Sequence, residues 1–186
     1  MPRLAQVRIT RLKVPLKAPY RLAFGPVTHF DTVVAECEAP DGASGLGEAT
    51  VLTGYTDETI EGAWRTAGEI AGRIKGLESR TAREMLKPLV KEHPFTVTAF
   101  ATAIEMLEGS PYLRNDFLRE VPLLAGINAV GEEAVREEFE RLYGEGYRTF
   151  KVKVGFELEK DLAHVRFVQK VAAGKAKLRI DANQGY

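Results

Sequence analysis

The sequence of 186 residues predicts an α+β domain followed by a shorter run of alternating strands and helices. Three observations predict this fold class. Up to about residue 50, apolar and polar residues alternate, as in antiparallel strands with one buried face. Between about residues 56 and 109, apolar residues recur at helical spacing. After Gly109, short apolar strands alternate with amphipathic helices, which is typical of a parallel sheet.

The composition limits the classes of function. Hydrophobic residues make up 45% of the sequence, which is enough for one large or two small domains with a buried core. Lysine plus arginine equals aspartate plus glutamate, at 26 each, so no net charge attracts nucleic acid or an anionic membrane. We therefore expect no nucleic-acid partner and no membrane partner.

The sequence also indicates a cellular compartment. No stretch approaches membrane-spanning length, and the N-terminus lacks the continuous apolar segment of a secretion signal. The only cysteine, Cys37, lies on the apolar side of an alternating strand and is predicted to be a small buried residue. A chain without a disulfide framework fits a reducing compartment, so we expect a cytoplasmic protein.

Three strands are predicted near the N-terminus. They cover residues 5–16, residues 30–39 up to the turn sequence Pro-Asp-Gly, and residues 45–50. A loop at 17–29 carries Tyr20 and Phe24, and a loop at 51–57 carries Tyr55. Aromatic residues in loops near strand ends are candidates for ligand contacts, although such residues more often cover a local core.

Three helices follow these strands. They are predicted from Thr56 or Asp57 to about Ile74, over residues 81–92 with an interruption at Pro88, and over residues 95–110. The third helix carries Ala99, Ala101 and Ala103, whose small side chains suit close packing on a neighbouring element.

The second half predicts a strand–helix–strand–helix–strand run. The strands are predicted at 121–128, 149–155 and 177–186, and the helices at 131–147 and 158–174. Inward residues are expected to be Val135, Phe139, Leu142 and Tyr143 in the first helix and Leu162, Val165, Val168 and Val171 in the second. The strand centres Leu124, Val152 and Ile180 are evenly spaced, close to the roughly 31 residues per unit of an eight-unit βα barrel.

Both a barrel and an open doubly wound sheet contain this strand–helix–strand–helix–strand order. An open sheet that binds dinucleotides would need a G-x-G-x-x-G turn after its first strand, and the segment AGINAVGEE lacks that pattern. Polar residues instead follow successive strands, at Asn128, Lys153 and Asp181. In a barrel, that end of the strands forms the active-site face.

Two lysines lie on one face of a predicted strand. Because side chains alternate along a strand, Lys151 and Lys153 point away from Phe150, Val152 and Val154. Like charge and partial burial both lower the pKa of a lysine, so one of the two can serve as a neutral general base. The alternative is an exposed edge strand with two solvated lysines.

The next strand ends in a second polar pair. Asp181 and Asn183 are also two residues apart, so a carboxylate and an amide are expected to share the space of the lysines. Such oxygens suit Mg²⁺, but one carboxylate does not hold it well, and further ligands must come from elsewhere. The same Asp-x-Asn pattern also occurs in ordinary Asx turns.

In combination, these segments resemble the enolase superfamily. GLGEA at 45–49, VPLLAGIN at 121–128, FKVKVG at 150–155 and LRIDANQGY at 178–186 occur in its order and at about its separations. The sequence most resembles the muconate lactonizing enzyme branch, which includes dipeptide epimerases and acylamino acid racemases and is related to mandelate racemase. The most specific element is Lys-x-Lys followed one βα unit later by Asp-Ala-Asn.

The resemblance implies a fold. Residues 1–118 would form an α+β capping domain, and residues 119–186 the first three βα units of a modified (β/α) TIM-type barrel. Three strands cannot close a barrel and would leave open edges. The chain is therefore expected to be a fragment, or to be completed by a second chain, and the complete protein is expected to be a homo-oligomer.

The resemblance also implies roles for site residues. Lys153 would be the catalytic acid/base on one face of the substrate, and Lys151 would tune its pKa and help to neutralise a substrate carboxylate. Asp181 would be the first Mg²⁺ ligand, with Asn183 beside it. Substrate selection would fall to the loops that carry Tyr20, Phe24 and Tyr55.

Two classes of function remain open at this point. The first is an isomerase or lyase that uses Mg²⁺ and removes the α-proton of a small carboxylate substrate through an enediolate. Epimerisation, cycloisomerisation and dehydration all start from that intermediate. The second is a noncatalytic module for binding or assembly that lacks the remaining metal ligands.

Overall fold

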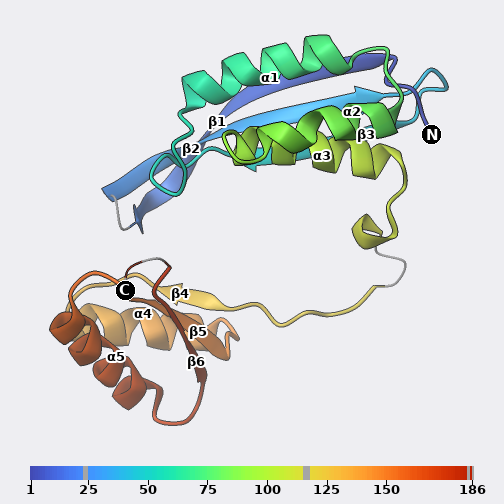
Figure 1. Cartoon of the computed structure of the whole chain (residues 1–186). Coiled ribbons are helices and arrows are strands. Elements are labelled where there is room, and N and C mark those ends of the chain that lie inside the picture. Colours follow the sequence, from blue (N-terminus) through green and yellow to red (C-terminus); the bar gives the residue numbers. More distant parts are fainter. Residues whose placement is uncertain (23–24, 115–117, 184, 186) are drawn as a thin grey trace. The chain divides into compact units, whose positions relative to one another are not determined.

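A computed structural model describes residues 1–22, 25–114, 118–183 and 185 (Figure 1). The chain forms two compact units. The first contains Met1–Tyr20 and Pro26–Phe117, and the second consists mainly of Leu118–Tyr186. Within the described ranges, no helix has the length and apolar character needed to cross a membrane.

The first unit contains a three-stranded sheet with the order β1-β2-β3. These strands are β1 (Gln6–Leu22), β2 (Gly25–Glu38) and β3 (Ser44–Thr50). β2 and β3 are antiparallel, with Thr32 opposite Thr50. The turn predicted after the second strand is confirmed, since the Gly42 N–H donates to the Ala39 carbonyl at 3.0 Å.

The loop predicted at residues 17–29 is wrong. β1 continues to Leu22 and β2 begins at Gly25, so Tyr20 lies in a strand, while Phe24 lies outside the described residues. The prolines of this segment suggested a loop. However, a proline and the residue before it both favour extended backbone, and the edge position of β1 tolerates a missing N–H donor.

Helices complete the first unit. They are α1 (Ile60–Ile74), α2 (Ser79–Leu86), the short 3₁₀ helix η1 (Lys87–Leu89) and α3 (Pro94–Leu107), so the interruption predicted at Pro88 is confirmed. The predicted start of α1 is wrong by a few residues. Thr59 caps the helix by accepting the Gly62 N–H at 3.1 Å, whereas the Thr56 hydroxyl accepts the N–H of Glu58 at 3.2 Å.

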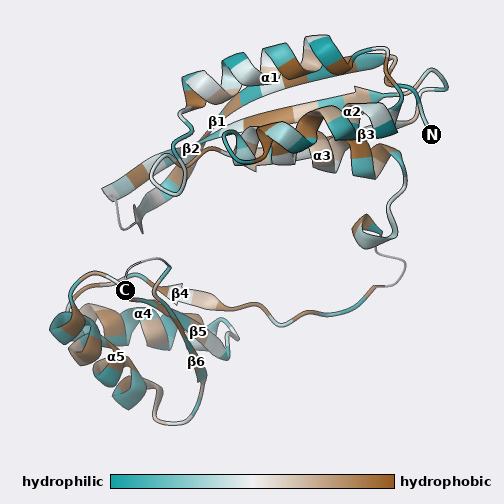
Figure 2. Ribbon diagram, viewed as in Figure 1, coloured by the Kyte–Doolittle hydropathy of each residue, from teal (hydrophilic) through white to brown (hydrophobic). Residues whose placement is uncertain are grey.

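The core of the first unit lies between the sheet and α3. Ala99 and Ala103 are fully buried, and their backbone lies directly on Gly47 of β3, so the predicted close packing is confirmed for these two residues, whereas Ala101 is only partly buried. Figure 2 shows much of β2 in the hydrophobic colour. Cys37 on β2 is buried as predicted, and burial raises the pKa of its thiol to about 11.

The second unit is a parallel sheet covered by helices. Its elements in order are β4 (Ala125–Ile127), α4 (Glu132–Gly144), β5 (Thr149–Lys153), α5 (Leu158–Ala172) and β6 (Lys177–Asp181). The strands pair in the order β4-β5-β6 and are parallel, so the predicted alternation is confirmed. β4 is shorter than predicted and excludes Leu124. Val121 and Leu123, which were also predicted in the strand, are exposed.

The core of the second unit lies between this sheet and its two helices. Phe139 of α4 and Phe150 of β5 are fully buried, with ring centroids 4.6 Å apart. Val168 and Val171 of α5 are buried as predicted, but Leu162 is 40% exposed, which contradicts the inward position predicted for it. Leu162 lies one turn from the amino end of α5, and the buried stripe of the helix lies farther along at Val168 and Val171.

Candidate active site

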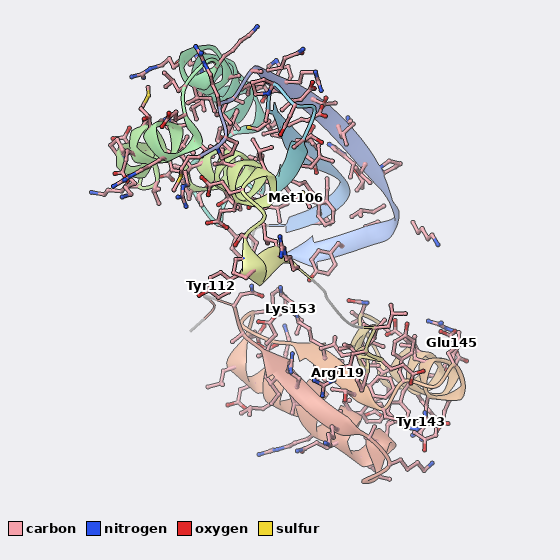
Figure 3. The ribbon with its side chains drawn as sticks, turned by 90° about the vertical axis from the view of Figure 1, so that its right-hand side faces the viewer. Met106, Tyr112, Arg119, Tyr143, Glu145 and Lys153 are labelled. Carbon is pink, nitrogen blue, oxygen red and sulfur yellow. The ribbon has the colours of Figure 1, made fainter. Side chains whose placement is uncertain are left out.

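The two lysines of β5 share one face of the strand. Phe150 and Val152 are fully buried on the helix-covered face, whereas Lys151 and Lys153 are only partly exposed on the opposite face. The predicted alternation is therefore confirmed. Figure 3 labels Lys153 at one end of this unit, with Tyr143 toward the other.

The register of the sheet brings a carboxylate to these lysines. Lys153 is directly opposite Asp181 of β6, and Lys151 is opposite Arg179. The Lys151 Nζ atom lies 2.6 Å from Asp181 Oδ2, with both side chains about one quarter to one third exposed. The structure thus brings together three of the residues that the sequence singled out.

Electrostatics keep Asp181 ionised. Its pKa is lowered from the ordinary value of 3.8 by the Lys151 ammonium first, then by the Asn183 N–H and by the charge of Lys153. The Asn183 N–H donates to Asp181 Oδ1 at 3.0 Å, and Asn183 has a φ of 48°. This geometry is an Asx turn, so that alternative for the Asp-x-Asn pattern is confirmed for the backbone.

Replacing Lys151 by methionine should raise the pKa of Asp181 toward the usual range of aspartate. The ion pair favours the carboxylate only in the folded chain, so its contribution to stability is present above the unfolded pKa and is lost as pH falls through the folded pKa. The test is a ¹³C NMR titration of the Asp181 carboxyl carbon. Lys160→Met is the control, because Lys160 pairs with Glu157 and not with Asp181. An unchanged Asp181 titration in Lys151→Met would contradict the ion pair.

The turn after β5 lies against the turn after β6. The Val154 N–H donates to the Asp181 carbonyl at 2.9 Å. Gly155 has a φ of 98°, and a Cβ atom there would lie 2.6 Å from the Ala182 carbonyl oxygen. Only glycine fits this position, so the strand ends that carry Lys153 and Asp181 are closely connected.

Two helix carboxylates that the sequence analysis did not single out shape the strand ends. Asp161 of α5 accepts the N–H groups of Gly155 and Phe156, at 2.8 and 2.9 Å. Glu138 of α4 accepts those of Asn128 and Ala129, both at 2.8 Å. Asn128, a predicted polar strand end, is therefore fixed through its backbone.

Asp181 fits the role of one ligand of a hard cation, because it is an ionised carboxylate on the lysine face. Over residues 1–22, 25–114, 118–183 and 185, no three His, Cys, Asp or Glu side chains form a group able to hold a metal ion. A complete Mg²⁺ site would therefore need ligands from outside these residues.

Two of the three predicted aromatic residues, Tyr20 and Tyr55, belong to the first unit. Tyr20 and Tyr55 are each partly buried there. Tyr55 lies in the segment before α1, which Glu58 ties to the start of α3. The buried Glu58 carboxylate accepts the Thr96 N–H at 3.2 Å and the Thr96 hydroxyl at 2.6 Å. The roles of both tyrosines in substrate selection stay predictions.

Comparisons with known proteins agree with this fold. Residues 4–107 match the family domain described as "Mandelate racemase / muconate lactonizing enzyme, N-terminal domain", and residues 134–186 match "Enolase C-terminal domain-like". An L-Lys-D/L-Arg epimerase of Methylococcus capsulatus is 29% identical over 99% of this chain and 54% of its own length. The chain thus spans about half the length of the curated relatives it matches.

Solved structures show the same architecture. A dipeptide epimerase from Cytophaga hutchinsonii, in complex with Mg and D-Ala-L-Val, has a TM-score of 0.85 at 21% identity, over 100% of this chain and 53% of that one. A dipeptide epimerase from Methylococcus capsulatus, in complex with Mg and L-Arg-D-Lys, has a TM-score of 0.79 at 26% identity, over 99% and 55%. These likenesses confirm the predicted fold class, an α+β domain followed by part of a TIM-type barrel. The chain belongs to the mandelate racemase / muconate lactonizing enzyme family of the enolase superfamily.

Proposed function

We propose that this chain is the N-terminal part of an enzyme that uses Mg²⁺ to remove the α-proton of a small carboxylate substrate. The observation that carries the proposal is the convergence of Lys151, Lys153 and Asp181 on one face of a parallel sheet. Among the possible outcomes we favour epimerisation or racemisation, because similar proteins are named as epimerases of dipeptides and as a racemase of N-succinyl amino acids.

The chemistry explains why cations are needed at this site. A proton α to a carboxylate is very weakly acidic, and its removal places a second negative charge on the carboxylate oxygens. Fixed positive groups must meet that charge where it develops. When bound, Mg²⁺ would supply positive charge at the substrate carboxylate. Asp181 would be one of its ligands, and the others would come from outside the described residues.

The two lysines would have different tasks. Lys153 would take the α-proton on its Nζ atom in the neutral form and return it in the ammonium form. Lys151 would hold the Asp181 carboxylate in place through the 2.6 Å contact and add positive charge beside the substrate. Their backbone is held by Phe150 and Val152, which are fully buried on the other face of β5.

A closed barrel is part of the proposal. Three parallel strands do not enclose a site, so activity would require the remaining strands, supplied by a longer polypeptide or by a second chain. The complete protein would act in the cytoplasm as a homo-oligomer. Tyr20, Phe24 and Tyr55 would select the substrate.

An isotope exchange assay tests the function. Dipeptides and N-acyl amino acids are incubated in D₂O with Mg²⁺ and the protein in which the barrel is complete, and ¹H NMR follows the loss of the α-proton signal. We expect exchange that stops when EDTA removes the metal, and none from the 186-residue chain alone. A completed barrel that exchanges no α-proton of either substrate class would favour the noncatalytic binding or assembly module.

A further inference from the structure

Asp161 is a buried carboxylate for which the proposed reaction has no direct use. It lies in the first turn of α5 and is only 8% exposed. A buried charge is costly unless hydrogen bonds replace its water. Asp161 Oδ2 receives two such bonds, from the N–H groups of Gly155 and Phe156. These contacts tie the start of α5 to the turn that leaves β5.

That turn begins immediately after Lys153. Gly155 lies two residues beyond Lys153 and so close to Ala182 that no side chain fits between them. Val154 extends the sheet by donating to the Asp181 carbonyl at 2.9 Å. A carboxylate that fixes the Gly155 and Phe156 amides therefore also fixes the end of β5 against the end of β6.

Glu138 provides an internal comparison. It accepts two consecutive N–H groups of the turn after β4, at Asn128 and Ala129, as Asp161 does after β5. Both carboxylates thus shape a strand-to-helix turn. Only the turn held by Asp161 adjoins a strand that carries the paired lysines.

We propose that Asp161 is a positioning residue that holds Lys153 in place for proton transfer by fixing the turn at Gly155 and Phe156. This inference rests on the proposed function. Lys153 is the last residue of β5, so its backbone depends on that turn. Displacement of a catalytic group by about 1 Å can lower a rate about 100-fold.

The test compares Asp161→Ala, Asp161→Asn and Glu138→Ala in two measurements. In the 186-residue chain, hydrogen exchange followed by NMR should accelerate at least about tenfold at Gly155 and Phe156 in Asp161→Ala, and at Asn128 and Ala129 in Glu138→Ala. In the protein with a complete barrel, Asp161→Ala should lower kcat for α-proton exchange by about 10- to 100-fold with KM within about twofold.

The other variants separate positioning from general stability. Glu138→Ala should keep kcat within about threefold of the wild type, and Asp161→Asn should do the same, because its amide oxygen can still accept both N–H groups. Equal losses of kcat in Asp161→Ala and Glu138→Ala would overturn the proposal, as would a loss in Asp161→Asn as large as in Asp161→Ala. If the wild-type protein with a complete barrel exchanges no substrate α-proton, the proposed function is wrong. If the amide hydrogen of Gly155 exchanges with solvent at the same rate in Asp161→Ala as in the wild type, only the positioning role of Asp161 is refuted.

Discussion

Replacement of Lys153 by alanine should lower the Mg²⁺-dependent exchange of the substrate α-proton by about 10²- to 10⁴-fold, the usual contribution of a general acid/base. Lys153 lies opposite Asp181 at the end of β5, on the face that the helices do not cover. Removal of its amine leaves Lys151 as the other amine on this face of β5, and the Lys151 amine is paired with Asp181 at 2.6 Å. Exchange is measured by ¹H NMR in D₂O with the protein in which the barrel is complete.

A charge-matched control separates this effect from a general loss of positive charge. Lys170 is exposed near the end of α5, and alanine there keeps a good helix former, so Lys170→Ala should retain wild-type exchange. Binding should be retained in Lys153→Ala, because Asp181 and Lys151 still form their 2.6 Å contact. Exchange at the wild-type rate in Lys153→Ala would remove Lys153 from the role of base, although the family assignment would stand.

Most of the site could be predicted from the two-residue periodicity of strands. The two-residue repeat alone places Lys151 and Lys153 on one face, and the even spacing of the strands aligns Asp181 with them. Strand periodicity could not predict which residue pairs with Lys151. From the sequence, the main interaction of each lysine was expected to be repulsion by the other, whereas in the structure Lys151 pairs with Asp181.

The missed residues carry a weaker signal. Asp161 and Glu138 lie on helices, where an acidic residue is unremarkable because most helix carboxylates point into water. Asp161 differs in being buried, and burial at a charged helix position depends on tertiary contacts that no periodicity encodes. For Asp161, a usable signal would be an acidic residue in the first turn of the helix that follows the strand with the paired lysines. Glu138 lies in the middle of α4 and carries no such signal.

The errors in the first unit have a common physical origin. Local sequence signals predicted loops in this unit, namely the prolines of residues 17–29 and the turn-forming residues before α1. Contacts within the sheet and between helices instead determine where the elements begin and end. β1 therefore runs through the predicted loop, and Thr59 rather than Thr56 caps α1. Local propensity predicted which elements exist better than it predicted their ends.

Replacement of Gly47 by alanine should destabilise the first unit by at least about 3 kcal/mol, beyond the usual cost of an overpacked core. A Cβ atom at Gly47 would overlap the Ala99 carbonyl oxygen and would lie 2.6 Å from the Ala103 nitrogen. Both are backbone atoms of α3, so no side chain can rotate away to make room. The helix must move off β3, which opens the core that contains Phe100 and Ile104.

Urea unfolding followed by the fluorescence of Trp64 measures this loss. Trp64 is the only tryptophan of the chain and lies in α1, so the signal reports on the first unit by itself. Gly68→Ala is the matched control, because a Cβ atom at Gly68 of α1 meets nothing within 4 Å. In that helix interior, alanine should raise stability by about 0.5–1 kcal/mol. If Gly47→Ala unfolds at the same urea concentration as the wild type while Gly68→Ala is stabilised, the helix does not lie on the glycines of β3. The small residues of α3 would then need another explanation.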